Sequence, residues 1–168
     1  MRGAVADAPA SGPTLPGARP DAPWGFRQKV HFLLGESGPP RRSHPVLGHY
    51  AAGSRRIVPI TECPVHAPRG NELAFAFLDH LSGAALSPRT RRVLRGLAVR
   101  VAPHTGESMV TLVASEDGDR ALRAVTRRFI AATAPNSTHL NLHDRDDGYV
   151  SGAHTRMLDG SAHITERI

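Results

Sequence analysis

The most chemically reactive side chain in this sequence is its lone cysteine, Cys63. It follows a predicted strand, in the segment Thr-Glu-Cys-Pro-Val. A lone cysteine most often serves as a small buried apolar side chain. A nucleophilic thiolate would need a base, and although Glu62 and His66 lie close in sequence, no recognisable pattern places either of them. A single cysteine also excludes an intrachain disulfide and an all-cysteine metal site built from this chain alone, so any metal would need ligands from elsewhere.

A second group of polar residues alternates near the C-terminus. His139 and His143 lie two residues on either side of Asn141, so in a strand all three side chains face the same way. A metal site would need a third ligand, and Asp144 would point to the opposite face. The pattern therefore favours a polar strand facing solvent or RNA over a metal centre.

A third group is basic and lies close to the single tryptophan. Arg27 and Lys29 share one face if residues 25–36 form a strand, and Trp24 adds an aromatic ring beside them. Arginine makes bidentate contacts to phosphate and stacks on bases, which favours RNA binding, while a solvated charged face is the alternative. The same region contains four further arginines, Arg41, Arg42, Arg55 and Arg56.

The overall charge favours a polyanionic partner. The 168 residues carry a formal net charge of +6, and the sequence pI is about 10.9. Such a balance favours nucleic acid, although a GC-rich coding sequence also enriches arginine, alanine, glycine and proline. No apolar run reaches the roughly 20 residues that cross a bilayer, and the N-terminus lacks the apolar region of a secretory signal. We therefore expect a cytoplasmic protein with no membrane partner and no DNA specificity.

The chain divides into a tail and one domain. Residues 1–22 are rich in proline and alanine and cannot bury enough apolar surface to fold, so they are predicted to be disordered. Residues 23–168 are predicted to form an α+β domain, in which a mostly antiparallel sheet, a meander plus hairpins, packs against two helices. No glycine-rich strand-to-helix turn is present, so no Rossmann-type site for a dinucleotide or for S-adenosylmethionine (SAM) is visible.

Hydrophobic periodicity gives the expected elements. Apolar residues recur at helical spacing in residues 69–82 and 120–132. Gly83 is expected to end the first helix, and Asp117 or Asp119 to cap the second. Between the two helices, an arginine-rich run leads into a strand. The predicted strands are 25–36, 45–50, 55–60, 97–101, 108–114, 138–144, 155–158 and 162–168, with Asp159-Gly160 as the hairpin turn before the last.

Two segments resemble a known family. Residues 24–32, WGFRQKVHF, and residues 48–65, GHYAAGSRRIVPITECPV, resemble the central region of the SAM-dependent RNA (uracil-C5)-methyltransferases, which make 5-methyluridine in ribosomal or transfer RNA. The family motif is a WGYRNK-like strand followed by GFY-x-x-GSH-x-I-V-x-I-x-x-CP. Residues 106–113 resemble its GE-x-M-V-T-L-V strand, and Asn141 with residues 152–168 resembles the stretch leading to the catalytic domain. The resemblance covers nearly all of the predicted domain.

The resemblance implies roles for particular residues. In cluster-bearing members, the cysteine matching Cys63 is the fourth ligand of a [4Fe–4S] cluster, and an upstream C-x-G-G-C-like segment supplies the other three. That segment is absent, so Cys63 would be an orphan ligand, and this chain alone is expected to hold no cluster. Since the first matching strand faces RNA in the family, we predict RNA contacts from Trp24, Arg27, Lys29 and Arg55.

The resemblance also implies that the catalytic machinery lies elsewhere. In the family, a downstream domain carries a cysteine whose thiolate attacks C6 of a flipped uracil, SAM methylates C5, and a glutamate helps to remove the C5 proton. The 168-residue chain is therefore predicted to be a fragment or truncated homologue that contacts RNA, and ribosomal rather than transfer RNA. Alone it should bind no SAM and should not methylate. The alternatives are a stand-alone non-catalytic RNA-binding module and, less favoured, a basic protein–protein adaptor.

Overall fold

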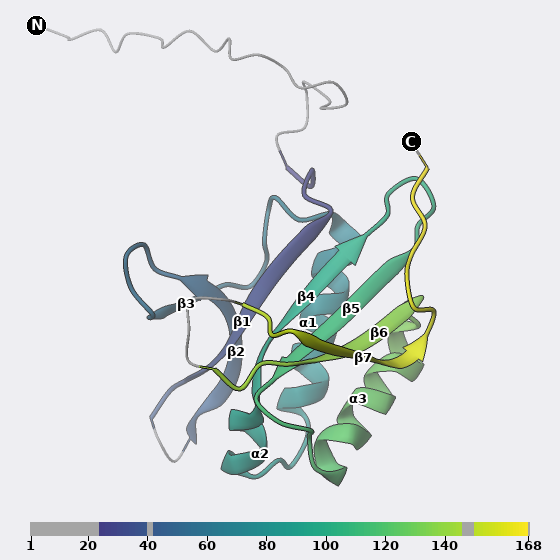
Figure 1. The fold of residues 1–168 in the computed structure, drawn as a ribbon. Helices are drawn as coiled ribbons and strands as arrows, with labels where there is room; N and C mark the ends of the chain where they lie inside the picture. The colour runs from purple at the N-terminus through teal and green to yellow at the C-terminus, as the bar shows by residue number, and fades with distance from the viewer. Residues whose placement is uncertain (1–23, 40–41, 146–149, 168) are drawn as a thin grey trace, which may run out of the picture.

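A single sheet with helices on one side organises the chain (Figure 1). The computed structural model describes residues 24–39, 42–145 and 150–167, so the predicted tail at residues 1–22 lies outside the described residues. Within them, seven strands follow the order β3-β2-β1-β4-β5-β6-β7, and all neighbours are antiparallel except β5 and β6. The elements are β1 (Lys29–Ser37), β2 (His44–Tyr50), β3 (Ile57–Pro59), α1 (Pro68–Ser82), α2 (Pro88–Val93), β4 (Leu94–Val101), β5 (Ser108–Ala114), α3 (Arg120–Thr133), β6 (Ser137–Leu142) and β7 (His154–Gly160). The predicted α+β class is confirmed.

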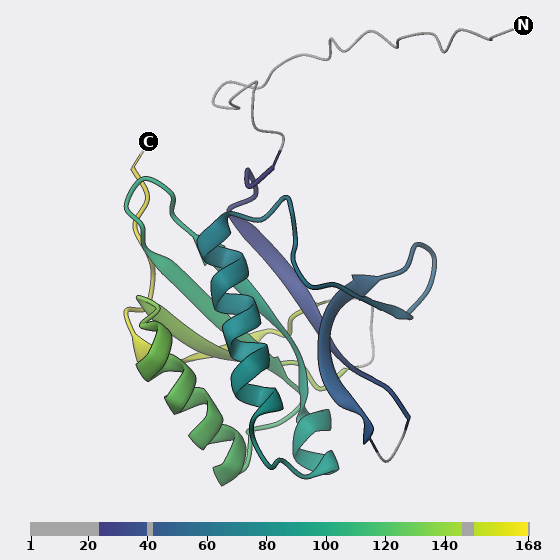
Figure 2. The same ribbon diagram turned by 180° about the vertical axis from the view of Figure 1, so that it is seen from behind.

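The core lies between the sheet and helices α1 and α3 (Figure 2). Side chains of a strand alternate between faces, so every second residue of the central strands points into this layer. On β1 these residues are Val30 and Phe32, both buried. The two helices meet through Phe77 and Phe129, whose rings contact edge to face with centroids 5.3 Å apart. The apolar spacing that predicted the two helices is therefore the spacing that builds the core.

The ends of these helices follow the predicted caps. The Asp119 carboxylate accepts a hydrogen bond from the Leu122 N–H at 2.9 Å and so caps the first turn of α3. Gly83 ends α1 and donates its N–H to the carbonyl of Asp79 at 2.9 Å. Of the two aspartates proposed as the cap of α3, the structure selects Asp119.

Helix α2 was not predicted, because the arginines around it suggested only a lead into a strand. Its first residue is Pro88, which suits the first turn of a helix. Ser87 caps it by accepting a hydrogen bond from the N–H of Thr90 at 3.1 Å. These two signals mark the helix start, and six residues are too few for apolar periodicity to show.

The first strand begins later than predicted, at Lys29 rather than at residue 25. Gly25 has a φ of +72° and donates its N–H to the carbonyl of Pro64 at 2.8 Å. Arg27 donates its N–H to the carbonyl of Val65 at 2.7 Å. The backbone that precedes β1 is thus hydrogen-bonded to the segment that leads into α1, and the sheet alternation does not extend back to Arg27.

The C-terminal prediction was wrong in one respect, because residues 162–167 form no strand. Strand β7 continues through the expected hairpin turn, and its last residue, Gly160, pairs with Ser137. Gly160 has a φ of +76°, which directs the following chain away from the sheet. That chain crosses the turn between β4 and β5, where the Thr105 hydroxyl donates to the carbonyl of Thr165 at 2.6 Å (Figure 1).

Candidate nucleic-acid interface

The face of the sheet opposite the helices carries an ordered array of side chains. Strand alternation sends every second residue to this helix-free face, and the pairing register aligns these residues across β1, β4, β5 and β6. Three cross-strand rows result, namely Lys29–Arg100–Met109–Ser137, His31–Ala98–Thr111–His139 and Leu33–Gly96–Val113–Asn141.

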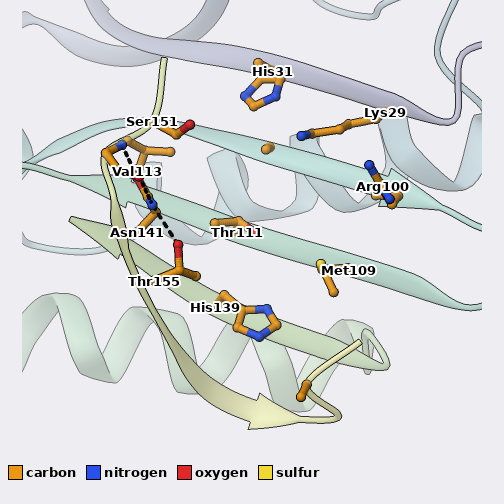
Figure 3. A pocket seen from close by; sticks show the side chains of 13 residues that line it. Lys29, His31, Arg100, Met109, Thr111, Val113, His139, Asn141, Ser151 and Thr155 are labelled. Carbon is orange, nitrogen blue, oxygen red and sulfur yellow. Dashed lines mark hydrogen bonds between the residues drawn. The ribbon is translucent and has the colours of Figure 1, made fainter. Parts of the chain in front are cut away.

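A cavity of about 370 Å³ opens over these rows (Figure 3). It is hollow because the middle row has short side chains, Ala98 and Thr111, between two histidines. Ser151 and Gly152, from the segment before β7, form one wall. The volume lies in the range of roughly 300–1,000 Å³ typical of small-molecule sites.

Asn141 holds that wall in place. Its amide oxygen accepts a hydrogen bond from the Gly152 N–H at 2.7 Å. Its amide nitrogen donates to the Gly152 carbonyl at 2.9 Å and to the Thr155 hydroxyl at 2.7 Å (Figure 3). A single buried amide thereby fixes both the segment before β7 and β7 itself against β6.

Replacing this amide should loosen the wall. Asn141→Ala should lower the free energy of unfolding by about 1–3 kcal/mol, because it leaves buried polar partners unsatisfied. Urea unfolding measures this loss, and hydrogen exchange at Gly152 should become faster. Asn141→Asp, which sets a buried carboxylate against the carbonyls of Gly152 and His154, should lose at least as much. A urea midpoint unchanged by Asn141→Ala would show that other contacts hold the wall.

The electrostatics of the cavity are one-sided. Among the described residues that line it, Lys29 and Arg100 are the cations and none is a carboxylate. Burial lowers the pKa of His31 from its usual value, and the charge of Lys29 lowers it further. Burial also lowers the pKa of His139. Both imidazoles are therefore neutral at pH 7 and able to donate and accept hydrogen bonds.

A second hollow of about 210 Å³ continues along the same face. It shares His31 and Val113 with the first cavity and adds the half-exposed ring of Tyr50. It also adds Arg95, whose guanidinium donates to the carbonyl of Arg145 at 2.7 Å. The helix-free face thus offers cations, rings and polar side chains over four neighbouring strands, which are the groups that recognise nucleic acid.

The four residues predicted to contact RNA are not gathered at one point. Only Lys29 lines the cavity. Trp24 is 63% exposed ahead of β1, and Arg55 lies in the connection between β2 and β3. The charge of Arg27 lowers the pKa of His49, after burial, and the His49 ring stacks on Phe32 of the core. Arg27 therefore acts toward the core side of β2 rather than toward the cavity.

One residue of the cavity, and the role of another, were not predicted from the sequence. Arg100 stands in a predicted strand, but its pairing with Lys29 depends on the register between β1 and β4. The clamping role of Asn141 depends on where the segment before β7 lies. The polar face predicted for His139 and Asn141 is present, although both side chains are buried beneath that wall.

Cys63 is a core residue. It is 6% exposed, and its backbone N–H and carbonyl are both held by the Asn71 side chain at 2.9 Å. Among the residues that the structure describes, no three His, Cys, Asp or Glu side chains gather to hold a metal ion. A [4Fe–4S] cluster needs four ligands, so the residues of this chain do not fit such a cluster by themselves.

Comparisons with known proteins give the context of this interface. No family model matches the chain. An uncharacterized RNA methyltransferase of Gloeobacter violaceus is 29% identical over 149 residues, which are 86% of this chain and 32% of that protein. Another, of Parasynechococcus marenigrum, is 33% identical over 125 residues, which are 71% of this chain and 27% of that protein. The chain thus spans about a third of the length of the relatives it matches.

A solved structure shares the fold. It is the tRNA (uracil-54, C5)-methyltransferase of Pyrococcus abyssi in complex with S-adenosyl-L-homocysteine, with a TM-score of 0.56 and 20% identity, over 88% of this chain and 34% of that one. None of the described helices is long and apolar enough to cross a membrane. By sequence the chain is similar to RNA methyltransferases, and its fold matches part of the fold of a uracil-C5 enzyme.

Proposed function

We propose that these residues form the RNA-binding part of a SAM-dependent RNA (uracil-C5)-methyltransferase, with the helix-free face of the sheet turned toward the RNA. The observation that carries the proposal is the cavity in which the described lining residues include Lys29 and Arg100 but no carboxylate, in a relative of RNA methyltransferases. Exposed cations favour a polyanion, and a surface free of carboxylates imposes no repulsion on phosphates.

Methyl transfer itself is proposed to rely on residues outside this chain. SAM would supply the methyl group, and a thiolate would activate the uracil. The chain's one thiol, Cys63, is buried in the core. The Asp119 carboxylate lies in the crossover from β5 through α3 to β6, where it is already engaged in capping α3. Labelled SAM and a uridine-containing RNA should therefore yield no methylated product with this chain alone. Formation of 5-methyluridine would contradict this division of labour.

Cys63 keeps a narrower proposed role. As a fourth cluster ligand it would need three thiolates from outside this chain and a local opening of the core around it. The Asn71 side chain hydrogen-bonds to both the N–H and the carbonyl of this cysteine, so its backbone would have to stay in place while the thiol became accessible.

A second basic patch is proposed ahead of β1. Trp24 and Phe26 are 63% and 60% exposed and lie just before Arg27 in the chain, and exposed rings beside a guanidinium suit unpaired bases. Arg27→Ala should weaken RNA binding and reduce the dependence on salt by about one counterion. Fluorescence anisotropy with ribosomal RNA fragments across a salt series measures both quantities, and transfer RNA tests which RNA class binds more tightly.

The matched control for this patch is Arg120→Ala. Arg120 is exposed at the start of α3, on the helix side of the sheet. Its removal should weaken binding less than the removal of Arg27. Equal effects of the two variants would mean that the RNA contacts are not concentrated at the segment ahead of β1.

A further inference from the structure

Two like charges face each other across the sheet, and no acid among the described residues compensates them. Lys29 of β1 pairs directly with Arg100 of β4 in the antiparallel register, and both side chains are exposed. Neither forms an ion pair with any residue that the structure describes. Like charges placed directly opposite destabilise a sheet. An anion between them would turn this repulsion into two charge-assisted hydrogen bonds.

The next cross-strand row forms the floor of the same site and carries neutral rather than cationic side chains. Ala98 and Thr111 form the floor, and Figure 3 shows the rings of His31 and His139 on opposite sides of it. The two rows lie roughly 7 Å apart, since each residue of a strand advances about 3.4 Å. Imidazole rings stack on bases, and a hydroxyl and neutral imidazoles hydrogen-bond to base edges.

We infer that this cavity binds one unpaired nucleotide of RNA, with its phosphate between Lys29 and Arg100 and its base over Ala98 and Thr111. The inference rests on the proposed function and specifies the form in which the RNA is bound. A base in a duplex is paired and stacked and cannot reach the floor of the cavity. The site therefore selects single-stranded RNA, whereas a flat basic surface would accept a duplex equally well.

Four ligands separate the possible sources of this chemistry. Single-stranded pentauridylate, an RNA hairpin whose affinity is compared per phosphate, uridine 5′-monophosphate and inorganic phosphate are titrated into the full chain. Pentauridylate should bind more tightly than the hairpin, and uridine 5′-monophosphate more tightly than phosphate. Binding is followed by calorimetry and by the NMR signals of the histidine rings.

Three variants locate the binding site. Lys29→Gln and Arg100→Gln should each weaken pentauridylate binding about ten-fold. Each also removes a like-charge repulsion, so neither should lower the urea midpoint. Ala98→Leu fills the floor and should weaken the uridine ligands while leaving phosphate binding unchanged. Arg120→Gln, on the helix side, is the control and should change none of these affinities.

The His31 ring gives a readout that a purely structural role would not move. Its pKa is held down by burial and by Lys29, so a bound phosphate should raise it, and Lys29→Gln should abolish most of that rise.

The outcomes distinguish this inference from the proposed function. RNA binding that is unaffected by all three variants would overturn the nucleotide site and leave the proposed function standing. Equal affinity for the hairpin, or phosphate binding as tight as that of uridine 5′-monophosphate, would also overturn it. Absence of binding to any RNA at low salt would overturn the proposed function itself.

Discussion

Phe129→Ala should lower the free energy of unfolding by about 3–5 kcal/mol, the loss typical of a large aromatic ring removed from a core. Phe129 is 0% exposed and packs edge to face against Phe77, so its ring joins α3 to α1 as well as to the sheet. The His80 ring lies against it as well, with centroids 6.2 Å apart. Urea unfolding followed by circular dichroism measures the difference.

The neighbouring residue provides the control. Arg128 precedes Phe129 on α3 but is exposed, so Arg128→Ala should change the free energy of unfolding by no more than about 0.5 kcal/mol. If Phe129→Ala cost as little as Arg128→Ala, the contact between α1 and α3 would not hold the helices on the sheet.

The success of the sequence in predicting these helices has a physical cause. The spacing of Leu122, Val125 and Phe129 records the helical period directly, and Asp119 marks the start by a local hydrogen bond. Both signals depend only on residues close in sequence. The meander was predicted for the same reason, because β1, β2 and β3 pair with their neighbours along the chain.

The predictions that failed depended on partners distant in sequence. The alternation of residues 25–27 looks like strand, but their backbone bonds to residues 64–67 instead. The Asp159-Gly160 pair carries a turn signal, but Gly160 uses its positive φ to leave the sheet after pairing with β6. In each case a local pattern was compatible with two structures, and a tertiary contact decided between them.

The candidate site was predictable only where its signal depends on residues close in sequence. The alternation of Lys29 and His31 shows that they share a face, and the structure places both in the cavity. The addition of Arg100 depends on register, which no single strand encodes. A cavity assembled from four strands is therefore visible in the sequence only as isolated polar residues.

A buried histidine in the core should make the stability of this protein depend on pH. His66 is 1% exposed, and its ring lies 5.7 Å from the ring of Phe32 and above Gly70 of α1. Neither ring nitrogen has a partner of good hydrogen-bond geometry among the described residues, although the Val99 backbone offsets part of the cost of burial. Burial lowers the pKa of His66 from 6.5 to about 4.

The sign of the effect follows from proton uptake. Between pH 6.5 and 4 the unfolded chain binds a proton at His66 and the folded chain does not, so acidification favours unfolding. The stabilising contribution is complete above pH 6.5 and should be lost as the pH falls through about 4, in total about 3 kcal/mol. The free energy of unfolding in urea, measured at intervals from pH 7.5 to pH 4, gives this profile.

Two variants assign the profile to one ring. His66→Leu replaces the imidazole with an apolar side chain of similar size and should flatten the decline in the free energy of unfolding. The decline that remains should come from the smaller contributions of the other partly buried histidines, His31, His49 and His139. His163→Leu alters an exposed ring and should leave a profile parallel to that of the unaltered protein. If His66→Leu declined as steeply as His163→Leu, the buried imidazole would not be the group whose protonation opens the core. A flattened profile would instead show that this core, which also encloses Cys63, accommodates the His66 ring only in its uncharged form.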